Sequence, residues 1–338
     1  MSVTIYDVAK RANVSIATVS RVLNNNPLVS EKTRERVLKA IEELNYSPNV
    51  IASALTKKST KTLGIVVPDI SNPFFAELAR GVEDACNDFG FTLIICNTDN
   101  SIDKEVSYIK LLKQKSIDGY IISTAYYNDE IVMKMIKSKV PLVLLGRDLE
   151  CEGCIFDAIV SDNEKGGYLA TKYLIDLGHK RIACLLGPPR VKVSLEREKG
   201  YLRAMNEANL KVCPELVGYG DFKVDFGYKK ALEMLTGRIK PTAFFAANDL
   251  TAVGVIKAAK FLGLKVPQDI SVVGYDNTML AELVDPPLTT ISQQMKKMGY
   301  LAAEMLIKRI RGERTPGDKV VFDVNLIVRK STGKLNQE

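Results

Sequence analysis

The chain has 338 residues, 46% of them hydrophobic and 26% charged, and a formal net charge of +7 at pH 7. This length suits two or three domains of about 100–200 residues each, and the composition excludes bulk disorder. The longest apolar runs have the length of strands, which excludes a membrane span of about 20 residues. The N-terminus lacks the basic segment and apolar stretch of a secretory signal, so we expect a cytoplasmic protein.

Residues 1–60 carry a disproportionate share of the positive charge. They hold nine lysines and arginines against five aspartates and glutamates, a net charge of +4 out of the +7 of the whole chain. Such an asymmetry favours an anionic partner, and nucleic acid is the usual one. Solvated helix faces carry the same residues, so the charge alone does not decide the function.

Three helices are predicted at the start of the chain. Apolar residues recur at helical spacing over 6–12, 16–23 and 31–44, with Thr4, Ser15 and Ser30 placed to cap the helices. Two short helices joined by a tight turn are the pattern of a helix-turn-helix motif. In this motif the start of the second helix faces base edges in the major groove of DNA.

The segments TIYDVAKRANVSIATVSRVLNN at 4–25 and NYSPN at 45–49 resemble the headpiece of the LacI/GalR family of bacterial transcription regulators. The resemblance implies a DNA-binding headpiece over residues 1–48. It also implies a homodimer that binds a pseudo-palindromic operator in double-stranded DNA, because two headpieces need two half-sites.

Within the headpiece, Arg21 can donate two hydrogen bonds to a guanine, whereas Ile16 and Ala17 offer only apolar contact, for example to a thymine methyl group. Ile16 could instead be a partly buried helix residue. Thr18, Asn25 and Tyr46 suit phosphate contact or packing. The predicted DNA-binding residues are Thr4, Ser15, Ile16, Ala17, Thr18, Arg21, Asn25, Tyr46, Ala52 and Leu55.

Residues 49–60 are predicted to form a linker that becomes helical only with partners. The segment NVIASALTKK at 49–58 favours a helix but is too short to be stable alone in water. The resemblance implies a hinge helix that orders on the operator, with Leu55 inserted as an apolar wedge into the minor groove. Leu55 could instead be an ordinary core residue.

Residues 61–338 are predicted to form a doubly wound α/β domain of two lobes. Strand-like runs alternate with helical patterns, which implies parallel sheets covered by helices. The segments 64–170 and 181–276 share this rhythm, and together the chain resembles the type I periplasmic sugar-binding fold, the effector domain of the family. Strands are expected at 62–67, 91–97, 119–123, 142–145, 158–161, 181–186, 216–220, 243–246, 271–275 and 290–293. The helices expected between them include 74–89, 104–114, 165–177, 199–208, 224–236, 249–262 and 295–311.

Ligands of parallel α/β sheets bind beyond the carboxyl ends of the strands. The residues that follow the predicted strands are arginines, amides, a carboxylate and two adjacent aromatics. Such groups donate to and accept from sugar hydroxyls, and aromatic rings pack against the flat C–H faces of sugars. By resemblance to bacterial ribose-binding proteins, the predicted effector-binding residues are Asn72, Phe74, Phe75, Arg147, Arg197, Asn248, Asp276 and Gln293.

One position departs from the ribose-binding pattern. Those proteins carry Asp immediately before the arginine at 147, and here the residue is Gly146. The loss of one hydroxyl acceptor puts ribose itself in doubt. Asp148 could replace it, but it would point to the opposite face if the strand continued. Arg197 is expected on a loop after the strand at 181–186. Asn248 and Asp249 could each cap the helix at 249–262, and Asp249 is the expected cap.

No metal, cofactor or enzyme activity is predicted. Cys151 and Cys154 form a lone CxxC, which lacks the second pair of a zinc site, and a reduced polar loop is expected there. The chain has one histidine, which disfavours a catalytic triad. We therefore expect a repressor of carbohydrate metabolism that is controlled by a pentose-like sugar. The alternative is a catabolite-control regulator triggered by a phosphorylated carrier protein.

Overall fold

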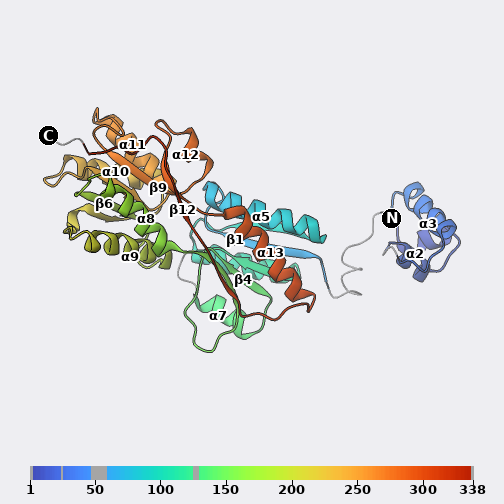
Figure 1. The fold of residues 1–338 in the computed structure, drawn as a ribbon. Coiled ribbons are helices and arrows are strands. Elements are labelled where there is room, and N and C mark those ends of the chain that lie inside the picture. The colour runs from blue at the N-terminus through green and yellow to red at the C-terminus, as the bar shows by residue number, and fades with distance from the viewer. Residues whose placement is uncertain (1–2, 24–25, 47–58, 125–128, 336–338) are drawn as a thin grey trace. The chain divides into compact units, whose positions relative to one another are not determined.

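The computed structural model of this chain describes residues 3–23, 26–46, 59–124 and 129–335. Asn25, Ala52 and Leu55 lie outside these residues, as does most of the predicted hinge helix. Contacts divide the chain after Thr60 into two compact units, which are described separately here as the headpiece and the body (Figure 1).

The headpiece contains the three predicted helices, α1 (Ile5–Arg11), α2 (Ile16–Leu23) and α3 (Glu31–Glu43). Each helix contributes a fully buried valine to a common core, Val8, Val19 and Val37 respectively. These three side chains meet in one buried cluster, so their burial fixes how the helices pack.

The body is built from two six-stranded sheets, each flanked by helices, and forms two lobes (Figure 1). All neighbouring strands pair in parallel except β12, which runs antiparallel to β10. In lobe 1 the strand order is β11 (Lys319–Phe322), β5 (Asp157–Ser161), β4 (Leu142–Leu145), β3 (Gly119–Ile122), β1 (Thr62–Val67) and β2 (Thr92–Asn97). In lobe 2 the order is β12 (Asn325–Ile327), β10 (Thr289–Ser292), β9 (Ser271–Asp276), β8 (Ala243–Ala246), β6 (Ile182–Leu186) and β7 (Val217–Tyr219).

The helices are divided between the lobes in the same way. Lobe 1 has α5 (Pro73–Phe89), α6 (Ile102–Gln114), α7 (Asp129–Lys137) and α13 (Met295–Ile310). Lobe 2 has α8 (Asn163–Asp176), α9 (Lys192–Glu207), α10 (Val224–Thr236), α11 (Asp249–Phe261) and α12 (Met279–Leu283), with a 3₁₀ turn at Pro214–Leu216.

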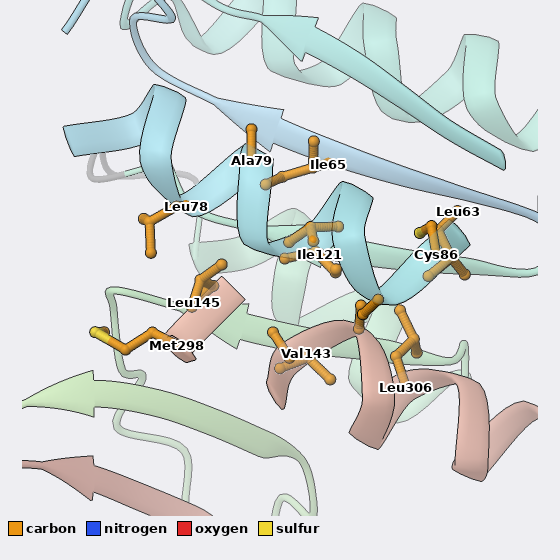
Figure 2. Packing of buried hydrophobic residues seen from close by; sticks show 14 of the residues in the cluster. Leu63, Ile65, Leu78, Ala79, Cys86, Ile121, Val143, Leu145, Met298 and Leu306 are labelled. Carbon is orange, nitrogen blue, oxygen red and sulfur yellow. The ribbon is translucent and has the colours of Figure 1, made fainter. Parts of the chain in front are cut away.

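In the core of lobe 1, a helix from late in the chain, α13, packs against a helix from early in the body, α5. Leu78 of α5, Val143 of β4 and Leu306 of α13 are fully buried in one cluster (Figure 2). A Cβ atom on Gly81 would lie 2.0 Å from the carbonyl oxygen of Lys296, so α5 and α13 touch backbone to backbone. This contact fixes α13, which begins just after the predicted effector residue Gln293.

The sequence prediction missed how the lobes exchange segments. The chain passes between the lobes after β5, after β10 and after β11, so the lobes are not the continuous segments 64–170 and 181–276. The strands β11 and β12, both partly exposed, were not predicted. The helices α7 and α12 were also missed.

The start of α9 was predicted seven residues too late. The helix begins at Lys192, so Arg197 lies on a helix and not on a loop. Val191 at the N-cap makes no side-chain capping bond and the first turn holds no acidic residue, so the sequence carries no start signal. The helix is stabilised instead by packing against α8, because Gly167 and Gly200 let α8 and α9 approach closely.

The cysteines also differ from expectation at one place. Cys151 and Cys154 are joined by a disulfide, whereas a reduced loop was expected. Cys86, Cys96 and Cys184 are free and buried. Within the described part of the chain, no helix combines the length and apolar character needed to cross a membrane.

Candidate functional site

A cavity of about 170 Å³ lies between the lobes at the carboxyl ends of the strands. Lobe 1 contributes residues that follow β1 and β4, and lobe 2 contributes residues that follow β8 and β9. Gln293 enters from the segment that joins β10 to α13. The cavity is lined by all eight predicted effector residues, Asn72, Phe74, Phe75, Arg147, Arg197, Asn248, Asp276 and Gln293.

Arg197 is the most constrained cation in this wall, with 5% of its surface exposed. Its Nε donates to Oδ1 of Asn163 over 3.0 Å and its Nη1 donates to the carbonyl oxygen of Ala247. The guanidinium carbon lies 3.7 Å from the centre of the Tyr275 ring. These contacts hold a planar set of donors in one orientation, which suits the recognition of paired oxygen atoms.

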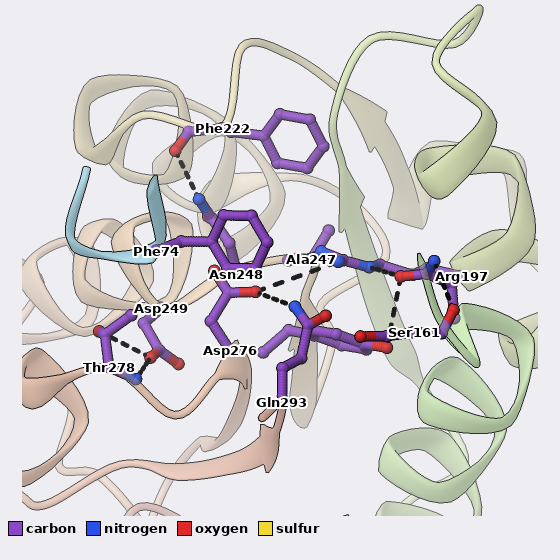
Figure 3. Close-up of polar contacts among 12 residues, drawn as sticks. Phe74, Ser161, Arg197, Phe222, Ala247, Asn248, Asp249, Asp276, Thr278 and Gln293 are labelled. Atoms are coloured by element: carbon purple, nitrogen blue, oxygen red, sulfur yellow. Dashed lines mark hydrogen bonds and ion pairs between the residues drawn. The ribbon is translucent and has the colours of Figure 1, made fainter. Parts of the chain in front are cut away.

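Asp276 and Gln293 form a polar pair beside Arg197 (Figure 3). Gln293 donates from Nε2 to Oδ1 of Asp276 over 2.7 Å, and that same oxygen is 4.0 Å from Nη2 of Arg197. Burial raises the pKa of the Asp276 carboxyl, against the opposing charge of Arg197. The Asp276 carboxyl is a buried polar group at the cavity wall that can hydrogen-bond to a hydroxyl.

Arg147 is fixed by its own lobe. Its Nη1 donates to the carbonyl oxygen of Thr124 over 2.9 Å, and its Nη2 pairs with the carboxylate of Asp129 at the start of α7. The preceding residue, Gly146, has a φ of +69°, and a Cβ atom there would have no neighbour closer than 3.7 Å. The position that holds Asp in ribose-binding proteins is thus left open.

The two asparagines of the cavity also cap helices. Asn72 Oδ1 accepts from the backbone N–H of Phe74 over 3.1 Å at the start of α5. Asn248 Oδ1 accepts from the N–H of Thr251 over 2.9 Å at the start of α11. Asn248, and not Asp249 as predicted, is therefore the cap of α11. Each amide keeps hydrogen-bonding capacity after its capping bond.

The aromatic lining comes from both lobes, and one member was missed. Phe74 and Phe75 pack edge to face with ring centres 5.0 Å apart, and both also touch the core of lobe 1. Phe222 lines the cavity from lobe 2, and its ring lies so close to Gly187 that a Cβ there would be 1.9 Å away. Phe222 lies two residues after the predicted strand 216–220, so the rule that found the other residues would have found it too.

A salt link between the lobes borders the same cavity. Lys192, the first residue of α9, lies 3.2 Å from Asp148 of lobe 1, and both residues line the cavity. Asp148 does not point away as expected, because β4 ends at Leu145. Among the described residues, no group of three or more His, Cys, Asp or Glu is arranged to hold a metal ion.

In the headpiece, the predicted base-reading residues share the exposed surface of α2. Ile16 is 39% exposed, and Ala17 and Arg21 are exposed. Ser15 Oγ accepts from the N–H of Thr18 over 3.2 Å, which caps α2. Thr4 and Tyr46, the other predicted DNA-binding residues named here, make different kinds of contact. Thr4 donates from its backbone and its hydroxyl to Asp7 at the start of α1, and Tyr46 packs against the headpiece core.

Both parts of the chain match known families. Residues 4–49 match the model described as bacterial regulatory proteins, lacI family, and residues 171–332 match a periplasmic binding protein-like domain. The HTH-type transcriptional regulator DegA of Bacillus subtilis (strain 168) is 41% identical over 339 residues, which cover 99% of this chain and 100% of that protein. The HTH-type transcriptional repressor PurR of Aliivibrio salmonicida is 40% identical over 335 residues, which cover 98% and 99%.

Solved structures agree with this assignment. The lac repressor dimer bound to operator and the anti-inducer ONPF has a TM-score of 0.88 at 30% identity, over 98% of this chain and 100% of that chain. A regulator from Enterococcus faecium with bound ribose has a TM-score of 0.72 at 32% identity, over 81% and 100%. This chain therefore belongs to the lacI family of bacterial regulatory proteins and is a DNA-binding transcriptional regulator.

Proposed function

We propose that this protein represses genes of carbohydrate use and that a small, pentose-like sugar in the cavity between the lobes relieves the repression. The observation that carries the proposal is the composition of the cavity. Arg197, Asp276 and Gln293 lie close enough together for one small sugar to reach all three. They offer fixed donors and a buried acceptor for its hydroxyl groups. Phe74 and Phe222 add flat apolar surfaces from opposite lobes. This combination suits a polyhydroxylated ring better than an apolar or a purely anionic ligand.

The ribose bound by the Enterococcus faecium relative supports a sugar as the effector class. The mechanism we propose is linkage between two binding sites. A sugar that prefers one arrangement of the lobes shifts the molecule toward it, and operator affinity changes by the same coupling free energy, about 1–3 kcal/mol in typical cases.

A homodimer on a pseudo-palindromic operator follows from the same proposal, because two headpieces must reach two half-sites. The lac repressor neighbour was solved as a dimer on its operator. In this chain, Met279 and Leu283 are four residues apart on α12, and 61% and 69% of their surfaces are exposed. Residues at this spacing share a helix face, and such an apolar face suits burial against a second copy.

The proposal is tested by thermal unfolding against D-ribose, other pentoses, hexoses, purines and sugar phosphates. A ligand present at about 100 times its Kd stabilises the folded state by about 2.7 kcal/mol. We expect one pentose to raise the unfolding midpoint of the wild type and of Arg203→Ala, but not that of Arg197→Ala. Arg203 is a matched control, because it lies on the same helix and pairs with Glu207 on the surface. No response to any sugar would contradict the proposal and favour a protein partner.

A further inference from the structure

Asp249 is a buried carboxylate whose hydrogen bonds connect three segments of lobe 2. It is 1% exposed and is the first residue of α11. Its Oδ2 accepts from the N–H of Thr278 over 2.7 Å and from Oγ1 of Thr278 over 2.9 Å (Figure 3). Its Oδ1 accepts from Oγ1 of Thr290 over 2.6 Å. The carboxylate thus links α11 to the turn after β9 and to β10.

The same three segments carry three of the predicted effector residues. Asn248 precedes Asp249 directly, Asp276 lies two residues before Thr278, and Gln293 lies three residues after Thr290. The approach is close, since a Cβ on Gly274 would lie 2.7 Å from Oδ1 of Asp249. The glycine in β9 therefore leaves room for this carboxylate.

The turn that Asp249 holds is strained. Asp276 has a φ of +109° and Asn277 a φ of +59°, a region that residues with side chains rarely adopt. Such conformations persist only where surrounding contacts impose them. Thr278, at the far end of the strained pair, is bound to Asp249, and Asn277 Oδ1 accepts from Nη2 of Arg329 over 2.8 Å.

We infer that Asp249 is a positioning residue of the effector site, which holds the strained turn so that the carboxylate of Asp276 is aimed into the cavity before any ligand binds. The inference rests on the proposed function only for the identity of that ligand. Preorganisation of this kind lowers the cost of binding, because the acceptor does not have to be ordered by the ligand.

The charges around the two carboxylates distinguish this role from simple packing. Asp276 faces Arg197 of α9, Asp249 of α11 and Glu77 of α5, with the neutral amide of Gln293 beside it, and Asp249 also faces Arg329. Burial raises the pKa of both carboxyls, Arg197 lowers that of Asp276, and the negative charge of Asp249 raises it further. Removing the charge at 249 must therefore lower the pKa of Asp276.

This predicts a signature in the pH dependence of folding. A carboxyl whose pKa is raised in the folded state costs stability as pH rises from its ordinary value of about 4 through the raised value. In Asp249→Asn this loss should be smaller and should be complete at a lower pH than in the wild type. The unfolding midpoint of the full chain, measured across pH without ligand, reports the change.

Two further variants separate charge from hydrogen bonding. Thr278→Val removes the hydroxyl bond that lowers the pKa of Asp249 but keeps the carboxylate, so it should carry the loss of stability to higher pH and still weaken sugar binding. Asp157→Asn is the matched control, because Asp157 is fully buried and accepts from the N–H groups of Gly317 and Asp318 over 3.0 and 3.1 Å. It lies at the amino end of β5, away from the cavity, and should lower stability without changing the affinity for sugar.

D-ribose is the binding probe, and crystal structures of the variants report the turn. We expect Asp249→Asn to raise the Kd for D-ribose by about tenfold or more, the effect of losing a buried hydrogen bond to a charged group, and to relax φ at 276 or 277 to negative values. A wild-type turn in Asp249→Asn would overturn the inference whatever the pH profile, because the loss of a titrating carboxyl at 249 changes that profile by itself. If the wild type binds neither D-ribose nor another pentose, the proposed effector class is wrong, while the turn still decides the role of Asp249. If Asp249→Asn fails to fold, Thr278→Val decides through the turn and its ribose affinity.

Discussion

At the scale of single residues, Arg21 is the one exposed side chain of α2 that can donate two hydrogen bonds to a base. We expect Arg21→Ala to weaken binding to an operator, selected by this protein from random DNA, by about 1–3 kcal/mol and to relax the preference at one base pair. Arg36→Ala on the exposed surface of α3 is the control and should change affinity without changing sequence preference. Fluorescence anisotropy on variant operators measures both. Equal losses on every sequence would show that Arg21 contacts only phosphate.

Gly146 is the residue that sets this cavity apart from the ribose-binding pattern. A Cβ at this position would lie 3.7 Å from Ser123 Oγ and 3.8 Å from Phe74 Cζ, so a side chain has room to enter the cavity. The φ of +69° strains most residues, but Asp tolerates it better than others. We expect Gly146→Asp to bind D-ribose more tightly than the wild type, because it restores a hydroxyl acceptor.

Gly146→Ala is the control for this change, since it introduces backbone strain, somewhat more than Asp does, without an acceptor. Isothermal titration calorimetry with D-ribose compares the three proteins. A Gly146→Asp variant that binds ribose no better than Gly146→Ala would show that the ligand does not approach this side of the cavity.

The cavity residues illustrate what the sequence can and cannot predict. Asn72, Arg147 and Asp276 were predictable because each follows a parallel strand, and the carboxyl ends of such strands converge. Phe222 obeys the same rule and was overlooked. Asp129 could not be assigned in this way, because its role comes from a contact with Arg147 that only the folded chain creates.

At the scale of elements, the contact of α8 with α9 places Arg197. A Cβ on Gly167 would lie 2.2 Å from the carbonyl oxygen of Arg197, so the two helices can pack this closely only if residue 167 is glycine. We expect Gly167→Ala to lower the free energy of unfolding by about 1–3 kcal/mol, as other overpacked cores do, and to weaken sugar binding by displacing Arg197.

Urea unfolding measures the first effect and sugar titration the second. Gly263→Ala is a useful contrast, because it has a φ of +75° but no atom within 4 Å of its added Cβ. It should cost some stability through backbone strain and leave sugar binding unchanged. If Gly167→Ala binds sugar like the wild type, the position of Arg197 does not depend on this helix contact.

The boundaries of the strands also show what a local sequence pattern can predict and what depends on contacts between distant segments. Central strands such as β1 and β8 were predicted to the residue, because they are short apolar runs buried on both faces. The strands β11 and β12 are partly exposed strands at the edges of the two sheets. Their pairing is set by the passage of the chain between lobes, which no local pattern contains.

At the scale of the whole molecule, the cavity is the place where both lobes and two of the passages between them meet. Asn163 follows the first passage and Gln293 lies in the second. Lys192 and Asp148 add a charged contact from lobe to lobe. A ligand that touches these groups contacts both lobes at once, so its binding free energy can favour one arrangement of the lobes over another.

We propose above all that a small sugar in this cavity controls the affinity of the protein for its operator. The most direct measurement is operator affinity of the full chain, by fluorescence anisotropy, with and without the sugar that raises the unfolding midpoint. We predict that the sugar weakens operator binding by about 5- to 150-fold and that Arg197→Ala binds the operator equally well with and without it. An operator affinity that the bound sugar leaves unchanged in the wild type would contradict the account.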